Sequence, residues 1–167
     1  SSLGRVSHCM EETAYHEAGH AFMASYLGGF VRSVTIEPDR DDGPNRLGDV
    51  QIVWPSGRMS AKEFQNKLVL VALAGPVVEM IYRGEPLHPG FVAEWADDWR
   101  KAWDAAEPIL ADQQKRLAFL EETARELYGL LHRDQHWAAI AALADHILAH
   151  ETLETEEIQE ILAVWRR

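Results

Sequence analysis

The chain has very little cysteine and a strong deficit of positive charge. Its 167 residues include one cysteine, Cys9, so no disulfide can form within the chain and nothing requires an oxidising compartment. A metal site in this chain must therefore use imidazole and carboxylate ligands instead of a set of thiolates. The formal net charge of -11 argues against binding to nucleic acid or anionic membranes through bulk electrostatics.

Long hydrophobic segments are also missing. The first residues, "SSLGRVSHCMEE", contain no apolar segment of a secretory signal, although processing before Ser1 stays open. The most apolar run, residues 68–78, is about half as long as a bilayer span and is interrupted by Gly75 and Pro76. We therefore expect a buried core helix in this region, and a soluble, cytoplasmic protein with no membrane segment.

The order of hydrophobic patterns predicts one mostly helical domain over residues 1–167. Ser60 and Glu63 form a capping-box signature at the start of one long helix, and Pro76 is expected to kink or split that helix. Helices are predicted at about residues 7–27, 60–82, 92–107, 109–131, 135–150 and 155–165. Strands are predicted at residues 31–38 and 47–55, with a polar loop at 39–46. The predicted fold class is α+β and predominantly helical, with a small two-strand β element and a C-terminal helical bundle.

Two histidines stand four residues apart in "TAYHEAGHAFMASYL", residues 13–27. His16 and His20 share one helix face and can bind one ion together. Glu17 is rotated by about 100° from His16, so it can hold a metal-bound water instead of the metal. This is the arrangement of H-E-x-x-H metallopeptidases, in which zinc activates a water and the glutamate takes its proton. We expect Gly19 to allow close approach of a neighbouring element. The alternative is a helix that carries two ordinary histidines, and the motif needs a third ligand.

Three solutions for the third ligand can be compared by spacing. The extended pattern H-E-x-x-H-x-x-G-x-x-H fails, because Met23 and Tyr26 occupy the positions of its glycine and histidine. Glu79, on the apolar helix, is a second possibility, and its alternative is a satisfied polar residue in a mostly buried helix. The third solution is Asp98, in the segment "VAEWADDWRKAWDAAE".

Helical periodicity favours Asp98. Trp95, Trp99 and Trp103 mark one apolar stripe, which we interpret as core packing. The polar residues Glu94, Asp97, Arg100, Lys101 and Asp104 fall on the opposite face. Asp98 lies at the edge of the apolar stripe, about 60° from Trp95. A carboxylate directed towards the core must be paired, protonated or metal-bound. The predicted zinc ligands are therefore His16, His20 and Asp98.

Five further histidines are weaker candidates. His132 with His136, and His146 with His150, have the same helical spacing, but neither pair has an adjacent glutamate. We expect both pairs to be solvated surface residues, with an accessory metal as the alternative. His88, in the loop "EPLHPG", could approach the predicted zinc site.

These segments resemble the peptidase domain of the FtsH-type ATP-dependent zinc metalloproteases, peptidase family M41. The resemblance is carried by "TAYHEAGHA", by "LGDVQIVWPSG" with "SAKEF", by "LVALAGPVVEMIYRGE", by "ADDWRKAWDAA" and by "HILAHETLETEEIQEIL". It spans nearly the whole chain. It implies a zinc peptidase in which His16, His20 and Asp98 bind the metal and Glu17 is the general base.

The chain also departs from the pattern of that family. The 167 residues contain no P-loop (G-x-x-x-x-G-K-[ST]) of the kind the family's ATPase module uses. Pro76 stands where the family has an arginine, and Asp97 stands where it has an asparagine. The region between residues 104 and 127 is shorter, which puts the family's hexameric assembly in doubt for this chain. A homo-oligomer stays open, without support from the sequence.

The sequence therefore predicts a zinc-dependent, ATP-independent endopeptidase. Its expected partners are unfolded or flexible polypeptide substrates, without nucleic acid, and the strand at residues 49–54 could bind them as an added β-strand. One alternative is a non-catalytic M41-like module that contains zinc and binds a peptide or a partner. Another is a fragment of a longer ATPase-peptidase.

Overall fold

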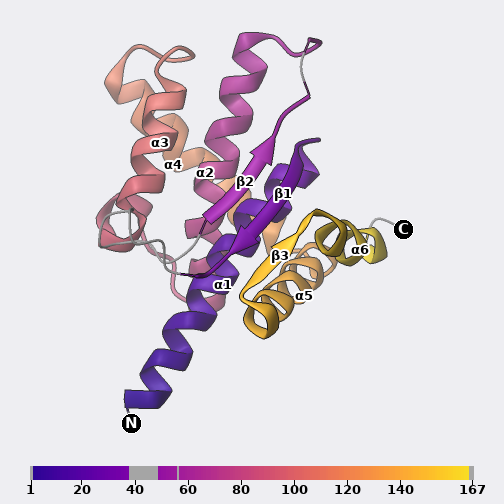
Figure 1. Ribbon diagram of the computed structural model, residues 1–167. Coiled ribbons are helices and arrows are strands. Elements are labelled where there is room, and N and C mark those ends of the chain that lie inside the picture. The colour runs from indigo at the N-terminus through magenta and orange to yellow at the C-terminus, as the bar shows by residue number, and fades with distance from the viewer. Residues whose placement is uncertain (1, 38–48, 56, 166–167) are drawn as a thin grey trace.

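The computed structural model describes residues 2–37, 49–55 and 57–165 (Figure 1). The predicted polar loop at residues 39–46 lies outside the described residues. The helices and strands, in chain order, are α1 (Ser2–Tyr26), β1 (Phe30–Thr35), β2 (Asp49–Val53), α2 (Ala61–Arg83), α3 (Ala96–Ala106), α4 (Gln113–Leu131), α5 (Asp134–His150), β3 (Thr152–Glu154) and α6 (Thr155–Trp165). Two short 3-10 turns, η1 (Pro89–Phe91) and η2 (Ala93–Trp95), precede α3. The predicted fold class, α+β and predominantly helical, is confirmed.

Helix α1 is the centre of the fold. Residues 16–25 are buried without interruption, because α1 packs against α2, α5 and the sheet, which crosses it in Figure 1. Gly19 lets α1 and α2 approach closely: a Cβ there would lie 2.7 Å from Cγ2 of Val78 and 2.8 Å from the carbonyl oxygen of Ala74. The expected close approach at Gly19 is confirmed, and it brings α2 beside the two histidines.

The sheet has three antiparallel strands in the order β2-β1-β3. The sequence predicts two of these strands and misses the third. The missed strand, β3, has three residues, too few for a recognisable alternating pattern. It is held to β1 by backbone pairing and by a 2.8 Å hydrogen bond between the hydroxyls of Thr35 and Thr152. Strand β2 is the outer strand of the described sheet on the other side.

Helix α2 runs through Pro76 as one continuous helix, so the prediction that Pro76 could split it is wrong. Packing explains this, because every residue from Val71 to Met80 is buried. The predicted N-cap is confirmed, since the hydroxyl of Ser60 accepts a hydrogen bond from the backbone N–H of Glu63. Among the described helices, α2 alone has the length and apolar composition to cross a membrane, and 61% of its most apolar window is buried inside the fold.

Two predicted helices begin later than expected. The one predicted from residue 92 starts as the η2 turn and becomes α-helical at Ala96. The one predicted from residue 109 starts at Gln113, after Asp112, whose side chain caps it by accepting from the N–H of Lys115. Arg116 holds the preceding residues out of the helix, because its guanidinium donates to the carbonyl oxygens of Leu110 and Ala111.

Candidate metal centre

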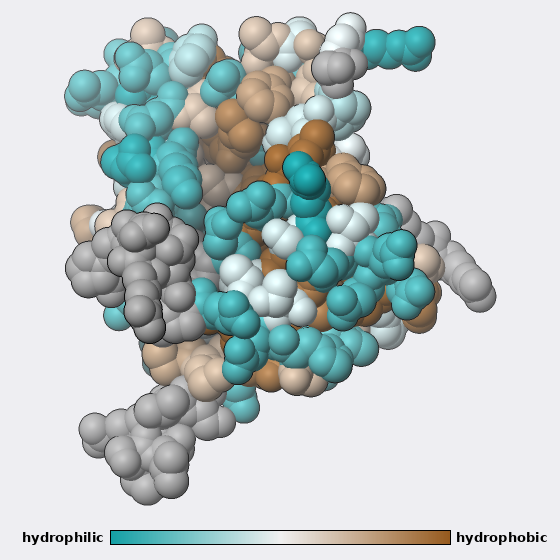
Figure 2. All heavy atoms as spheres, in the orientation of Figure 1, coloured by the Kyte–Doolittle hydropathy of each residue, from teal (hydrophilic) through white to brown (hydrophobic). Residues whose placement is uncertain are grey.

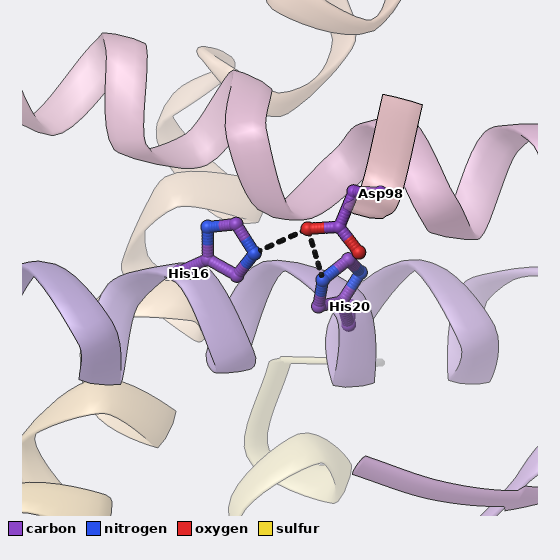
Figure 3. A group of neighbouring side chains, drawn as sticks. All are labelled: His16, His20 and Asp98. Atoms are coloured by element: carbon purple, nitrogen blue, oxygen red, sulfur yellow. Dashed lines mark hydrogen bonds and ion pairs between the residues drawn. The ribbon is translucent and has the colours of Figure 1, made fainter. Parts of the chain in front are cut away.

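His16 and His20 of α1 meet Asp98 of α3 in the interior of the fold (Figure 3). The exposed fractions are 2% for His16, 7% for His20 and 2% for Asp98. Each residue offers one ligand atom, and these three atoms lie within 4.8 Å of one another. Within the described part of the chain, this is the one group of three or more possible His, Cys, Asp or Glu ligands. The structure thus brings together the three residues that the sequence predicts as zinc ligands.

The orientation of α3 agrees with the predicted helical phase. Trp95 is fully buried and Asp98 is buried beside it, while Trp99 and Trp103 are partly buried. The predicted solvent face is exposed at Glu94, Asp97, Arg100, Lys101 and Asp104. Asp97 forms ion pairs with Arg100 and Lys101 on this face. The two neighbouring aspartates therefore face opposite environments.

The Nδ1 atom of each histidine is occupied by an acceptor from α2. His16 Nδ1 lies 2.6 Å from Oε1 of Glu79, and His20 Nδ1 lies 2.7 Å from the carbonyl oxygen of Val71. Burial alone would raise the pKa of Glu79, but the hydrogen bond and charge of His16, together with Arg83, lower it, so Glu79 is an ionised acceptor. Both histidines must then carry a hydrogen on Nδ1. Their Nε2 atoms are left for another partner.

Both Nε2 atoms face one carboxylate oxygen. Oδ2 of Asp98 lies 2.7 Å from Nε2 of His16 and 3.4 Å from Nε2 of His20. Burial would raise the pKa of Asp98, but the charges of His20 and His16 outweigh it and hold the pKa well below its ordinary value. Neutral rings protonated on Nδ1 would present only lone pairs to this carboxylate. A proton or a metal ion must therefore lie between the carboxylate of Asp98 and the ring nitrogens.

The donor set suits zinc. Two imidazoles and one carboxylate are the three protein ligands of many catalytic zinc sites, which keep a fourth position for water or substrate. Zinc bonds of 2.0–2.1 Å in tetrahedral geometry separate ligand atoms by about 3.3 Å. The separation between His20 and Asp98 already has this size, and that between His16 and Asp98 is shorter by about 0.6 Å. All three ligand atoms lie within 4.8 Å of one another, so the side chains would have to move to reach tetrahedral distances, while the types of donor atom suit the ion.

Gly75 of α2 borders the rings of His16 and His20. A Cβ at this position would lie 2.4 Å from Nε2 of His20 and 2.8 Å from Nε2 of His16. Ordinary van der Waals contact begins near 3.4 Å, so any side chain here would occupy the space of the ligand atoms. Sequence reasoning missed this role and treated Gly75 only as an interruption of an apolar run.

Glu79, the sequence's second candidate for the third ligand, takes a different place. It contacts the Nδ1 side of His16, away from the Nε2 atoms that converge on Asp98. It is therefore a partner of a ligand residue and not a member of the converging group. Glu17 follows His16 in α1 and is 2% exposed. It is the third buried carboxylate of this region, after Asp98 and Glu79.

The remaining histidines lie outside the metal-ligand group. His88 interacts with Glu121 through Nε2, and its Nδ1 accepts from the N–H of Gly90, so both of its ring nitrogens have other partners and it is not in the group of possible ligands. The surface prediction for the two C-terminal pairs holds for the exposed residues His132, His146 and His150. It is wrong for His136, which is partly buried because Nδ1 donates to the carbonyl oxygen of Leu130 and the ring packs on Phe22 and Tyr26.

No protein-family model matches the sequence, and no curated protein is significantly similar to it. The resemblance to M41 peptidases therefore stays a prediction. The chemistry of the site rests on the geometry and electrostatics of its own residues.

Proposed function

We propose that this chain is a zinc-dependent, ATP-independent endopeptidase of the M41 type that hydrolyses unfolded or flexible polypeptides. One observation carries the proposal: two buried histidines, each with Nδ1 bound to an acceptor, direct Nε2 at a buried aspartate. Such a group of acceptors is stabilised by a cation at its centre. The H-E-x-x-H segment adds the glutamate that hydrolysis needs and that a purely structural zinc site does not.

The roles of the residues follow from their positions. His16, His20 and Asp98 would hold the ion, and Glu79 and Val71 fix the orientation of the two rings. A zinc ion there would lower the pKa of a water and polarise the scissile carbonyl group. Glu17 would accept the proton of the attacking water and return it to the leaving amine. The low exposure of the group keeps bulk water away from these charges, which strengthens their interactions.

The sheet offers a place for an extended substrate. Strand β2 pairs with β1 on one side, and on the other side it is the edge of the described sheet. Its residues alternate between exposed and partly buried, and Figure 2 shows mostly hydrophilic side chains on the sheet side of the molecule. An edge strand can bind an extended peptide by main-chain hydrogen bonds without regard to most of its sequence. Because the 167 residues contain no P-loop, we propose substrates that are already extended.

One observation favours a second candidate, a zinc-containing module without catalytic activity that binds a peptide or a partner. The three ligand residues are closely enclosed, and the most exposed of them, His20, is only 7% exposed. Structural zinc sites are closed in this way. The two candidates differ in whether Glu17 has a chemical role.

The deciding experiment compares wild type with Glu17→Gln, both loaded with one equivalent of zinc. The substrate is a reduced and alkylated protein that cannot refold, and new amino termini are counted over time. Glu126→Gln is the matched control, because Glu126 is an exposed glutamate on α4. Loss of a general base lowers hydrolysis by about 10²–10⁴-fold, while zinc content should stay unchanged.

The outcomes separate the candidates. Cleavage by wild type and by Glu126→Gln, with loss in Glu17→Gln, supports the endopeptidase. Stoichiometric zinc without cleavage by wild type contradicts it in favour of the binding module. Absence of zinc in all three proteins contradicts both candidates.

A further inference from the structure

A chain of polar contacts leads from the metal centre to the surface. His16 contacts Oε1 of Glu79 at 2.6 Å, and the other oxygen of Glu79 accepts from a guanidinium nitrogen of Arg83 at 3.1 Å. The same nitrogen of Arg83 donates to Glu12 of α1 at 3.0 Å. Side-chain exposure increases outward along the chain, from 3% at His16 and 8% at Glu79 to 25% at Arg83. Arg83 therefore stands between the buried carboxylate and solvent.

Arg83 adds to the stabilisation that His16 gives the buried carboxylate of Glu79. A carboxylate at this depth must be paired, and Arg83 is the cationic side chain with which Glu79 forms an ion pair apart from His16. Arg83 lies four residues after Glu79 on α2, so the helix itself fixes their spacing. The pair leaves Oε1 of Glu79 directed at Nδ1 of His16.

Two further contacts hold the guanidinium group in place. It lies over the ring of the fully buried Trp95, with 5.4 Å between the guanidinium carbon and the ring centroid. Glu12 binds it from α1, so Arg83 ties the last turn of α2 to the helix that carries the histidines. Its outer side borders a surface pocket of about 570 Å³ lined by Glu12, Tyr82, Arg83 and Glu85. A shorter or neutral side chain at this position can thus be solvated without leaving a sealed cavity.

We propose that Arg83 is a positioning residue of the metal centre and sets its zinc affinity by orienting His16 through Glu79. This inference rests on the proposed zinc site. Groups that orient a metal-binding histidine through its second nitrogen change metal affinity by about 10–100-fold when they are removed. We expect a weakening of this size in Arg83→Met, whose aliphatic side chain keeps contact with Trp95 but cannot bind either glutamate.

The test measures the zinc dissociation constant of the full chain by competition with a chelator of known affinity. Arg125→Met is the matched control, because Arg125 forms an exposed ion pair with Glu122 and should change zinc affinity by less than about 3-fold. Arg83→Lys keeps a positive charge beside Glu79 and should recover most of the affinity lost in Arg83→Met. In a Glu79→Gln background, Arg83→Met should have little further effect, because its path to His16 has been removed.

A second readout separates positioning from a general loss of stability. The proton on Nδ1 of His16 can be followed by nitrogen-edited NMR in the metal-free protein, and Arg83→Met should shift it while Arg125→Met does not. Zinc affinity unchanged in Arg83→Met, or an equal loss in the Glu79→Gln background, would overturn the inference and leave the zinc site intact. A wild type that binds no zinc would overturn the proposed function as well. If Arg83→Met does not fold, Arg83→Leu, which is also neutral and aliphatic, replaces it in the same measurements, with and without Glu79→Gln.

Discussion

Replacing Gly75 by alanine would add one methyl group at the point where α2 passes the histidine rings of α1. The new Cβ would lie 2.4 Å from Nε2 and 2.6 Å from Cε1 of His20, and 2.8 Å from Nε2 of His16. Since ordinary contact begins near 3.4 Å, the His20 ring must retreat by about 1 Å and the His16 ring by about 0.6 Å. The substitution therefore displaces both of the proposed imidazole ligands at once.

This displacement of the rings exceeds the tolerance of metal–ligand distances, but it should disturb the fold of the metal-free protein only slightly. Metal–ligand distances are held to about ±0.2 Å, so at least one imidazole should be lost as a ligand. We expect zinc to bind at least about 100-fold more weakly, which corresponds to about 2.7 kcal/mol. The colliding atoms are the ends of rotatable side chains, so the backbone can stay in place. Metal-free stability should fall by only about 1–2 kcal/mol, from strained hydrogen bonds to Glu79 and Val71.

The assay is zinc affinity by chelator competition, with urea unfolding of the metal-free protein as the measure of stability. Gly129→Ala is the matched control, because Gly129 is exposed within α4 and a Cβ there would meet no atom within 4 Å. It should keep wild-type zinc affinity and gain up to about 1 kcal/mol of stability. Wild-type zinc affinity in a folded Gly75→Ala protein would refute the proposed ligand set, because it would show that zinc does not need the Nε2 atoms of both histidines in their present positions.

Two other predictions concern neighbouring aspartates and one tyrosine. Asp98→Ala should lose stoichiometric zinc while Asp97→Ala keeps it, measured by mass spectrometry of the metal content; the reverse result would show that the orientation of α3 is wrong. Hydrogen bonding to Glu11 raises the pKa of Tyr82 from 10.0 to about 12, so the stabilisation by Tyr82 is fully present below about pH 10 and is lost as the pH rises towards 12. Tyr82→Phe should therefore be less stable than wild type at pH 8, by about 1 kcal/mol, and the difference in urea unfolding should narrow above pH 10; a constant difference would contradict this.

The sequence carries enough information to place Asp98 because its helix is strongly two-sided. Trp95, directly before α3, marks the buried side of this segment. Asp97 is exposed and Asp98 is buried, so a single residue step separates solvent from core. The H-E-x-x-H spacing likewise puts His16 and His20 on one face of α1. Local periodicity fixes these three positions, and the structure brings them together.

The α2 side of the site could not be predicted in the same way. Residues 71–80 are buried on every side of α2. Their hydrophobic pattern therefore does not indicate which side of the helix faces α1. The sequence alone therefore cannot tell whether Glu79 binds the metal or binds a metal-binding histidine. The answer depends on which ring nitrogen of His16 it contacts. Gly75 and the carbonyl group of Val71 act through the backbone of this helix, which sequence patterns do not reveal.

Strand β3 escaped prediction for a different reason. Its three residues acquire their conformation by pairing with β1, more than a hundred positions earlier in the chain. Glu151, just before it, adopts a φ of 64°, which an ordinary residue seldom does and which no turn signal in the sequence marks. Long-range pairing of so short a segment leaves no local trace.

X-ray absorption at the zinc edge tests the central claim most directly. The protein reconstituted with one equivalent of zinc should show two imidazole nitrogens and one carboxylate oxygen at about 2.0–2.2 Å, with a fourth light atom completing the coordination. The imidazole contribution should decrease in Gly75→Ala and the signal of bound zinc should vanish in Asp98→Ala. Zinc bound through fewer than two imidazoles, or through the sulfur of Cys9 at about 2.3 Å, would contradict the proposed metal centre.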